Sequence, residues 1–163
     1  MEKEIVNKLI ENKETIASME SCTAGYFATT ITNVEGASKV LQFSAITYSN
    51  LYKIRLGVNK EIIEKYGVYS METAKNMAKQ ITYFSESTYG VGITGKINRP
   101  DENNPNGNDN EVFCCIYDKD TMTYYCMTLN CPNKPRLMCK KYIVRQVMLK
   151  LLPLLERRYV HER

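Results

Sequence analysis

The sequence predicts an α/β fold in which helices cover both faces of a mixed β-sheet. Three observations lead to this prediction: an early strand–helix–strand order, a helix just before a third strand, and a late hairpin that is followed by a helix. At 163 residues the chain is expected to form one domain, 1–163. A chain of this length buries roughly 70% of its unfolded surface, which is enough for a full core without disulfides.

The first half of the chain alternates helical and strand patterns. Residues 2–13 place Ile5, Leu9 and Ile10 on one stripe between charged residues, which is typical of an amphipathic helix. The next predicted elements are a buried strand at 15–19, a largely buried helix at 22–32, a strand at 43–48 and a short helix at 61–66 that ends at Gly67. Ser70 then occupies the position of an N-cap, with apolar residues at helical spacing behind it.

The second half contains a strand, a long loop, a hairpin and a long helix. A third strand at 89–93 leads into KINRPDENNPNGNDN at 96–110, a polar stretch without a helix or strand pattern, which in a small domain is typical of a functional or a mobile loop. The hairpin strands are predicted at 111–117 and 121–129, followed by a turn at 131–135 and an amphipathic helix at 136–155. Pro153 is expected to bend or fray the end of that helix.

The histidine and cysteine content limits the kinds of catalytic and metal site that the chain can form. The chain has one histidine, His161, close to its C-terminal end, so a Ser-His-Asp triad, a Cys-His dyad or a His-ligated metal would depend on a residue that is expected to fray. The six cysteines form no C-x-x-C pair and no spacing typical of zinc. We therefore expect no metal site, free thiols and a cytoplasmic protein.

Charge and hydropathy bear on the partners. The net charge of +4 (22 Lys and Arg against 18 Asp and Glu) is too small to indicate a nucleic-acid partner, and DNA binding is not expected. The first thirteen residues carry charges throughout, which argues against a secretory signal, and no apolar run reaches the length of a membrane span.

Hydroxyl-bearing and small residues follow three of the predicted strands, at 20–23, 47–50 and 92–95. In open α/β sheets ligands bind at the carboxyl ends of the strands. The three segments therefore predict one common site.

Two side chains from these segments could supply nucleophilic chemistry. Ser21 lies where a strand gives way to a helix, whose N-terminal N–H groups suit an anion or an oxyanion, although a simple N-cap is the commoner role of such a serine. Lys53 could replace histidine as a base if it is desolvated, although most lysines are solvated at the surface. Tyr48 could donate a hydrogen bond or stack on a ring, or be an ordinary surface tyrosine.

Further residues could bind a ligand. Thr94 and Gly95 end the third strand, where small residues let a ligand approach the backbone or simply terminate the strand. Arg136 and Lys140 share one face of the last helix at i, i+4 and could hold a phosphate, although a solvated basic face is more common.

Five segments occur in the order and spacing of a known family. They are Glu20–Gly25, Ile46–Asn50 with Lys53, Leu56–Val58, Gly67–Ser70 and Gly92–Gly95. On these motifs the chain resembles the C-terminal domain of the competence/damage-inducible CinA proteins, which include stand-alone nicotinamide-nucleotide amidases. The resemblance is strong over 1–95 and looser over 110–157.

The resemblance implies a three-layer α/β/α domain with a mixed sheet, similar to the anticodon-binding domain. It also implies hydrolysis of the carboxamide of nicotinamide mononucleotide to nicotinate mononucleotide and ammonia, in pyridine-nucleotide salvage. The partner is then a small-molecule nucleotide, and no cofactor is implied. A homo-oligomer is compatible with the sequence.

Residue roles follow from the same motifs. The resemblance makes Ser21 the nucleophile, Lys53 the base and Tyr48 a donor to substrate or oxyanion. The implied substrate-binding residues are Thr23, Gly25, Ser70, Thr94, Gly95, Arg136 and Lys140. For Ser70 an N-cap role is the alternative.

The segment after Gly95 departs from the family pattern. The family continues with proline and paired glycines, whereas this chain has Lys96-Ile-Asn-Arg-Pro-Asp-Glu102. Because these residues are expected to shape nucleotide binding, a catalytically silent nucleotide-binding regulator or adaptor is the alternative function. A loop ordered over Ser21 and Lys53 would favour the enzyme.

Overall fold

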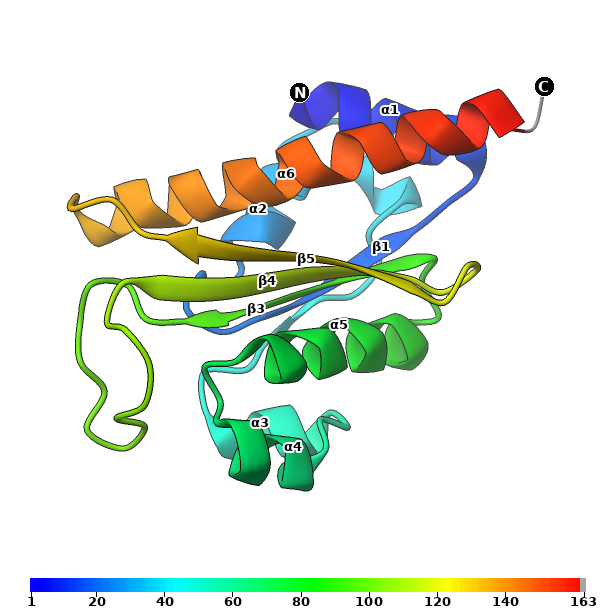
Figure 1. Ribbon diagram of the computed structural model, residues 1–163. Helices are drawn as coiled ribbons and strands as arrows, with labels where there is room; N and C mark the ends of the chain where they lie inside the picture. Colours follow the sequence, from blue (N-terminus) through cyan, green and yellow to red (C-terminus); the bar gives the residue numbers. More distant parts are fainter. Residues whose placement is uncertain (162–163) are drawn as a thin grey trace.

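A five-stranded mixed sheet forms the centre of the computed structural model, which describes residues 1–161, with side chains as far as residue 157 (Figure 1). The strands are β1 (Ile16–Glu20), β2 (Ala45–Ile46), β3 (Tyr89–Gly95), β4 (Glu111–Asp118) and β5 (Thr123–Asn130), in the order β2-β1-β3-β4-β5. β1 pairs in parallel with β2 and β3, whereas β3–β4 and β4–β5 are antiparallel.

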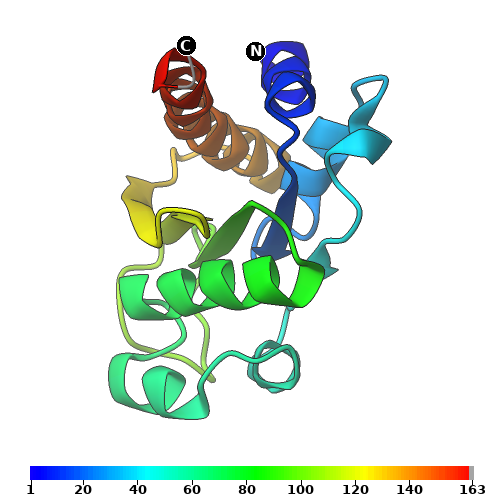
Figure 2. The same cartoon turned by 90° about the vertical axis from the view of Figure 1, so that its right-hand side faces the viewer.

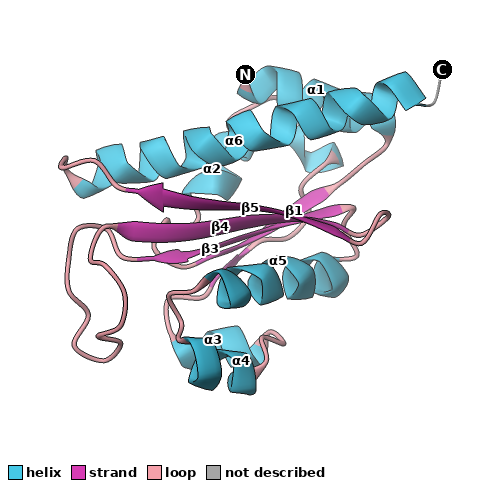
Figure 3. Ribbon diagram, in the orientation of Figure 1, coloured by secondary structure: helices cyan, strands magenta, loops and turns pink. Residues whose placement is uncertain are grey.

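Helices cover both faces of the sheet, which confirms the predicted α/β fold class (Figures 2 and 3). One face carries α1 (Glu2–Asn12), α2 (Tyr26–Thr32) and α6 (Arg136–His161), and the 3₁₀ turn Ala37–Lys39 lies between α2 and β2 along the chain. The other face carries α5 (Met71–Ser85), with α3 (Asn50–Arg55) and α4 (Lys60–Tyr66) beyond it. No helix in the described part, the 26-residue α6 included, is both long and apolar enough to cross a membrane.

Side-chain packing differs between the two faces of the sheet. The larger core lies between the sheet and α1, α2 and α6, and includes Leu9, Phe27 and Val147. On the other face α5 lies so close to β3 that a Cβ on Gly92 would be 2.3 Å from the carbonyl oxygen of Ala74. The close approach requires glycine there, and it fixes α5 firmly against the strand that leads to the predicted site.

Three predicted elements are wrong in extent. The predicted helix 22–32 begins only at Tyr26, the predicted strand 43–48 is reduced to Ala45–Ile46, and the predicted helix 136–155 continues to His161. Pro153 does not end α6 because it lies on the exposed side of the helix. Water can hydrate the carbonyl that lacks a donor there. The side chain of His161, which the sequence placed in a frayed tail, lies outside the described residues.

Helix α3 was not predicted. Ser49 caps it by accepting a hydrogen bond from the backbone N–H of Tyr52, and the helix is only six residues long. A helix this short has no apolar periodicity to recognise, yet it carries Lys53.

Candidate active site

Ser21 and Lys53 meet at the carboxyl end of the parallel strands. Ser21 directly follows β1, and its backbone N–H donates to the carbonyl of Ile93 in β3. The Lys53 side chain, only 2% exposed, places Nζ 3.3 Å from the Ser21 Oγ and 2.7 Å from the Thr47 carbonyl oxygen. The structure therefore brings the two residues together as a hydrogen-bonded Ser–Lys pair.

Burial lowers the pKa of Lys53 from its ordinary 10.5 to about 8, although the nearby Cys22 acts in the opposite direction. No described carboxylate forms an ion pair with the ammonium group that would restore its usual basicity. A neutral amine held by Thr47 has a lone pair that can accept the hydroxyl proton of Ser21. The pair can therefore act as nucleophile and base.

The turn that carries Ser21 is organised by Glu20, a fully buried carboxylate. It accepts hydrogen bonds from the hydroxyls of Ser18 and Thr23 and from the backbone N–H groups of Phe27 and Ala28, at 2.7–3.1 Å. These contacts satisfy donors at the start of α2 and fix residues 21–25 between strand and helix. Sequence reasoning gave Glu20 no role, although a carboxylate at the end of an otherwise uncharged strand was a usable signal.

This arrangement corrects two predictions. Ser21 is not at the first turn of α2, because that helix begins at Tyr26 and its N–H groups bond to Glu20. Thr23 is buried with its hydroxyl on the same carboxylate, so its side chain does not line the cleft.

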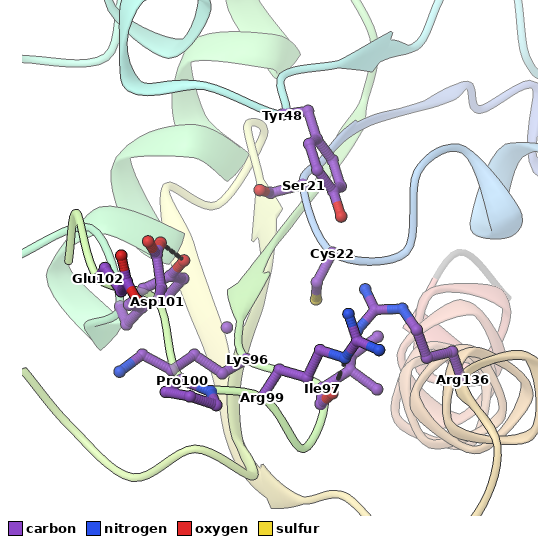
Figure 4. A pocket seen from close by; sticks show the side chains of 12 residues that line it. Ser21, Cys22, Tyr48, Lys96, Ile97, Arg99, Pro100, Asp101, Glu102 and Arg136 are labelled. Carbon is purple, nitrogen blue, oxygen red and sulfur yellow. Dashed lines mark hydrogen bonds between the residues drawn. The ribbon is translucent and has the colours of Figure 1, made fainter. Parts of the chain in front are cut away.

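Ser21 opens into a cavity of about 560 Å³, which we call the cleft (Figure 4). Its walls are the Ser21–Cys22 turn, Tyr48, Tyr69, Gly95, the 96–102 segment and Arg136. An adjoining hollow of about 270 Å³ shares Ser21, Tyr48, Tyr69 and Asp101 and adds Lys53. Tyr48 is 65% exposed, so it stands at the rim rather than in the floor.

Most residues of the 96–110 loop are exposed, but several of its side chains contact the rest of the chain beside the cleft. Tyr69 donates its hydroxyl proton to Asp101, and Asn50 on α3 donates to the side-chain oxygen of Asn104 at 3.4 Å. Burial, together with Asp101, raises the pKa of the Tyr69 hydroxyl, and the same bond lowers the pKa of Asp101. These contacts hold the loop beside Ser21 and Lys53.

Two arginines supply positive charge to the cleft. Arg99 comes from the loop and Arg136 from the start of α6, and their guanidinium groups lie on the same side of the cavity (Figure 4). Arg136 Nη1 donates to the Ile97 carbonyl at 3.1 Å, and neither arginine pairs with a carboxylate among the described side chains. The expected second cation, Lys140, does not line the cleft, whereas Arg99, which sequence reasoning missed, does.

Several predicted binding residues have structural duties. Ser70 caps α5 by accepting from the Thr73 N–H, so the N-cap alternative describes what it does. The Thr94 hydroxyl donates to the Val68 carbonyl at 2.9 Å, and Gly25 is the N-cap of α2 with φ +88°. Gly95 lines the cleft, but a Cβ there would be 2.5 Å from the Val112 Cα, so β4 already requires the glycine.

Cys22 also lines the cleft and was expected only as a core thiol. Burial raises its pKa to about 12, so it stays protonated and is a poor nucleophile beside Ser21. All six cysteines are free thiols. Within the described residues no three His, Cys, Asp or Glu side chains are grouped so that they could hold a metal ion.

Comparison with known proteins identifies the family. The family model described as the CinA C-terminal domain matches residues 1–155. The chain belongs to the CinA C-terminal domain family. It is 44% identical over 96 residues to a CinA-like protein of Desulforapulum autotrophicum, an alignment that covers 58% of this chain and 23% of that protein.

A CinA-like protein of Endomicrobium trichonymphae is 42% identical over 88 residues, or 53% of this chain and 21% of that protein. The aligned part of the chain thus spans less than a quarter of the length of these curated relatives.

Solved structures agree on the fold. A CinA superfamily protein from Klebsiella pneumoniae superposes with a TM-score of 0.86 at 16% identity, covering 96% of both chains. A competence/damage-inducible protein from Agrobacterium tumefaciens gives 0.80 at 24% identity, covering 95% of both. At these identities the likeness shows that this CinA-family domain shares their fold, and no more.

Proposed function

We propose that this CinA-family domain is a serine amidohydrolase that acts on the carboxamide of a pyridine nucleotide, with nicotinamide mononucleotide as the first substrate to test. The observation that carries the proposal is the contact between Ser21 Oγ and the buried amine of Lys53 at the edge of a cleft. A lysine with a pKa of about 8 is a competent base near neutral pH.

The steps follow from this geometry. Ser21 Oγ attacks the carboxamide carbon while Lys53 takes the hydroxyl proton, and the ammonium then protonates the departing amine. The C–N bond breaks, ammonia leaves and an ester on Ser21 is formed. A water molecule, deprotonated by Lys53, hydrolyses that ester and regenerates Ser21 with a nicotinate product.

Negative charge on the tetrahedral oxygen needs donors close to Ser21. The backbone N–H groups of Cys22 and Thr23 are the nearest in sequence, and the Tyr48 hydroxyl stands at the rim of the same cavity. Donors fixed by a rigid turn need no reorganisation during the reaction, which is what makes such groups effective.

The charge pattern of the cleft suits the proposed substrate. A phosphate matches the two guanidinium groups of Arg99 and Arg136, and a positively charged pyridinium ring matches the carboxylates of Asp101 and Glu102 in the same cavity. We propose Arg99 in place of Lys140 as the second cation at the phosphate.

The direct test is to incubate the purified protein with nicotinamide mononucleotide and to measure ammonia and nicotinate mononucleotide. We expect turnover by the wild type and none by Ser21→Ala or Lys53→Met. Absence of turnover by the wild type, or equal turnover by the variants, would overturn the proposal.

The second candidate is a silent nucleotide-binding domain, and the replacement of the family glycines after Gly95 favours it. It predicts that pyridine nucleotides raise the unfolding temperature without product formation. The two candidates are separated by measuring ligand-induced stabilisation and ammonia release in the same samples.

A further inference from the structure

Cys115 on β4 and Cys126 on β5 lie directly opposite each other, with their sulfur atoms 3.5 Å apart. Both are free thiols, and both side chains belong to the cluster that packs against α5. Cys114, the neighbour of Cys115, belongs instead to the core on the other face of the sheet. One pair of thiols, away from Ser21 in sequence and from the cleft lining, is therefore in contact across two strands.

The ladder gives this pair a particular geometry. The backbone N–H of Cys131 donates to the carbonyl of Asn110, so residues 110 and 131 are a hydrogen-bonded pair and every second pair along β4–β5 is of the same type. Cys115 is five positions from Asn110, which makes Cys115 and Cys126 a non-hydrogen-bonded pair. In such pairs the Cα atoms are about 4.5 Å apart. This distance lies within the range of about 4.4–6.8 Å that separates the Cα atoms of disulfide-bonded cysteines.

We propose that Cys115 and Cys126 form a thiol–disulfide exchange site, which reacts with a small disulfide such as oxidised glutathione and closes reversibly into a cross-strand disulfide. The sulfur atoms have to move from 3.5 Å to about 2.05 Å. Rotation of the two side chains supplies this movement, so the register of the strands can stay as it is.

The two thiols have different parts in the exchange. Cys126 is partly exposed on the outer strand β5 (Figure 3), whereas Cys115 is fully buried and burial raises its pKa. Cys126, as a thiolate, attacks one sulfur of oxidised glutathione and releases one glutathione thiolate, which takes up a proton. Cys115 then attacks the Cys126 sulfur as its proton passes to the second glutathione, which leaves as a thiol. Two protein thiols are oxidised by two electrons, and one glutathione disulfide is reduced to two thiols.

The bond is expected to be easily reduced. A Cα separation at the short end of the disulfide range strains the bridge, and strained, accessible disulfides are the labile ones. The site therefore suits a reversible response to oxidation rather than a permanent staple.

The test is to oxidise the folded protein with oxidised glutathione, block the remaining thiols with N-ethylmaleimide after denaturation, and map tryptic peptides by mass spectrometry. Because trypsin does not cut before proline, Cys115 lies in peptide 97–119 and Cys126 in peptide 120–136. We expect these two peptides to be linked, with two fewer blocked thiols than the six of the reduced protein. Dithiothreitol under native conditions should restore all six.

Four single Cys→Ser variants show which cysteines form the disulfide. Cys115→Ser and Cys126→Ser should each abolish the link, whereas Cys114→Ser and Cys131→Ser, whose residues share the same two peptides, should keep it. A competing bridge between the neighbouring Cys131 and Cys139 would link peptide 120–136 to 137–140 instead.

Absence of the 97–119/120–136 link in the wild type, or its persistence in Cys115→Ser, overturns the proposal whatever the protein does to nicotinamide mononucleotide.

Discussion

The two walls of the cleft are held in different ways. The Glu20–Gly25 turn is fixed by a buried carboxylate with four hydrogen-bond donors and by a bond from its Ser21 N–H to β3. The 96–110 loop faces it across the cleft and is attached by side chains near the surface. Its side-chain contacts with the rest of the chain include Tyr69–Asp101, Asn50–Asn104, Asn98 with the Pro132 carbonyl and Arg136 with the Ile97 carbonyl.

This difference separates two tasks that the cleft has to perform. A reacting hydroxyl has to stay within a fraction of an ångström of its base, which buried, fully satisfied contacts provide. Selectivity can change with the sequence of a loop, and loops on a rigid scaffold tolerate such change. We therefore expect variants of the turn to alter reactivity and fold stability, and variants of the loop to alter substrate affinity.

The largest effect is expected for Ser21→Ala. The variant loses the nucleophile but keeps the backbone contacts of the turn, so activity on nicotinamide mononucleotide should fall by at least about 10³-fold with little change in unfolding temperature. Steady-state kinetics and thermal unfolding measure both. Ser70→Ala is the matched control: the lost cap should lower stability by about 1 kcal/mol and leave the activity close to that of the wild type.

Lys53→Met is expected to abolish activity without destabilising the fold at pH 7. A pKa lowered from 10.5 to about 8 means that burying the ammonium costs about 3 kcal/mol, and methionine removes this cost while losing the bonds to Ser21 and Thr47. The unfolding temperature at pH 7 should therefore be at least that of the wild type. A clearly lower value would mean that the ammonium stabilises the fold.

The same pKa predicts two dependences on pH. Between about pH 8 and 10.5 the unfolded state binds more protons than the folded state, so wild-type stability should rise through this window and that of Lys53→Met should not. Because the neutral amine is the base, kcat/KM should rise with pH and level off above about 8. A flat pH profile would exclude Lys53 as the base.

Glu20→Ala tests the rigid wall itself. It leaves two hydroxyls and two N–H groups without their buried acceptor, which should destabilise the fold by about 3–5 kcal/mol. Chemical denaturation measures the loss. Glu14→Ala, a change of another buried glutamate away from the cleft lining, serves as the control and should lower activity less than Glu20→Ala at temperatures where both are folded.

Substitution of the cleft arginines is expected to change substrate affinity. Arg99→Gln or Arg136→Gln removes one guanidinium from the proposed phosphate site, and we expect KM for nicotinamide mononucleotide to rise about 10-fold with kcat nearly unchanged. Activity on the corresponding nucleoside, which has no phosphate, should not change. Lys140→Gln, whose residue lies on α6 outside the cleft, is the control for a general loss of positive charge.

The sequence predicted which strand ends meet at the cleft, but neither what fixes the Glu20–Gly25 turn nor which loop residues line the cavity. The strand ends that bring Ser21, Tyr48 and Gly95 together follow from local patterns and the topology of parallel strands. The role of Glu20 did not: its four partners lie within eight residues of it, but their offsets follow neither helix nor strand spacing, because a turn separates the strand from the helix. Arg99 was missed for a related reason: an irregular loop has no period, so which of its side chains faces the cleft depends on tertiary contacts.

The smallest effect is expected for Tyr69→Phe, which removes the hydroxyl that holds Asp101 and with it one attachment of the loop. A hydrogen bond to a carboxylate at a partly exposed position is worth about 1 kcal/mol, so KM should rise a few-fold while the Ser21–Lys53 pair and the pH profile stay unchanged. Hydrogen exchange should increase in the 96–110 loop and not in the Glu20–Gly25 turn. Equal increases in both would mean that the two walls are one cooperative unit, because a loosened loop would then loosen the turn that carries the nucleophile.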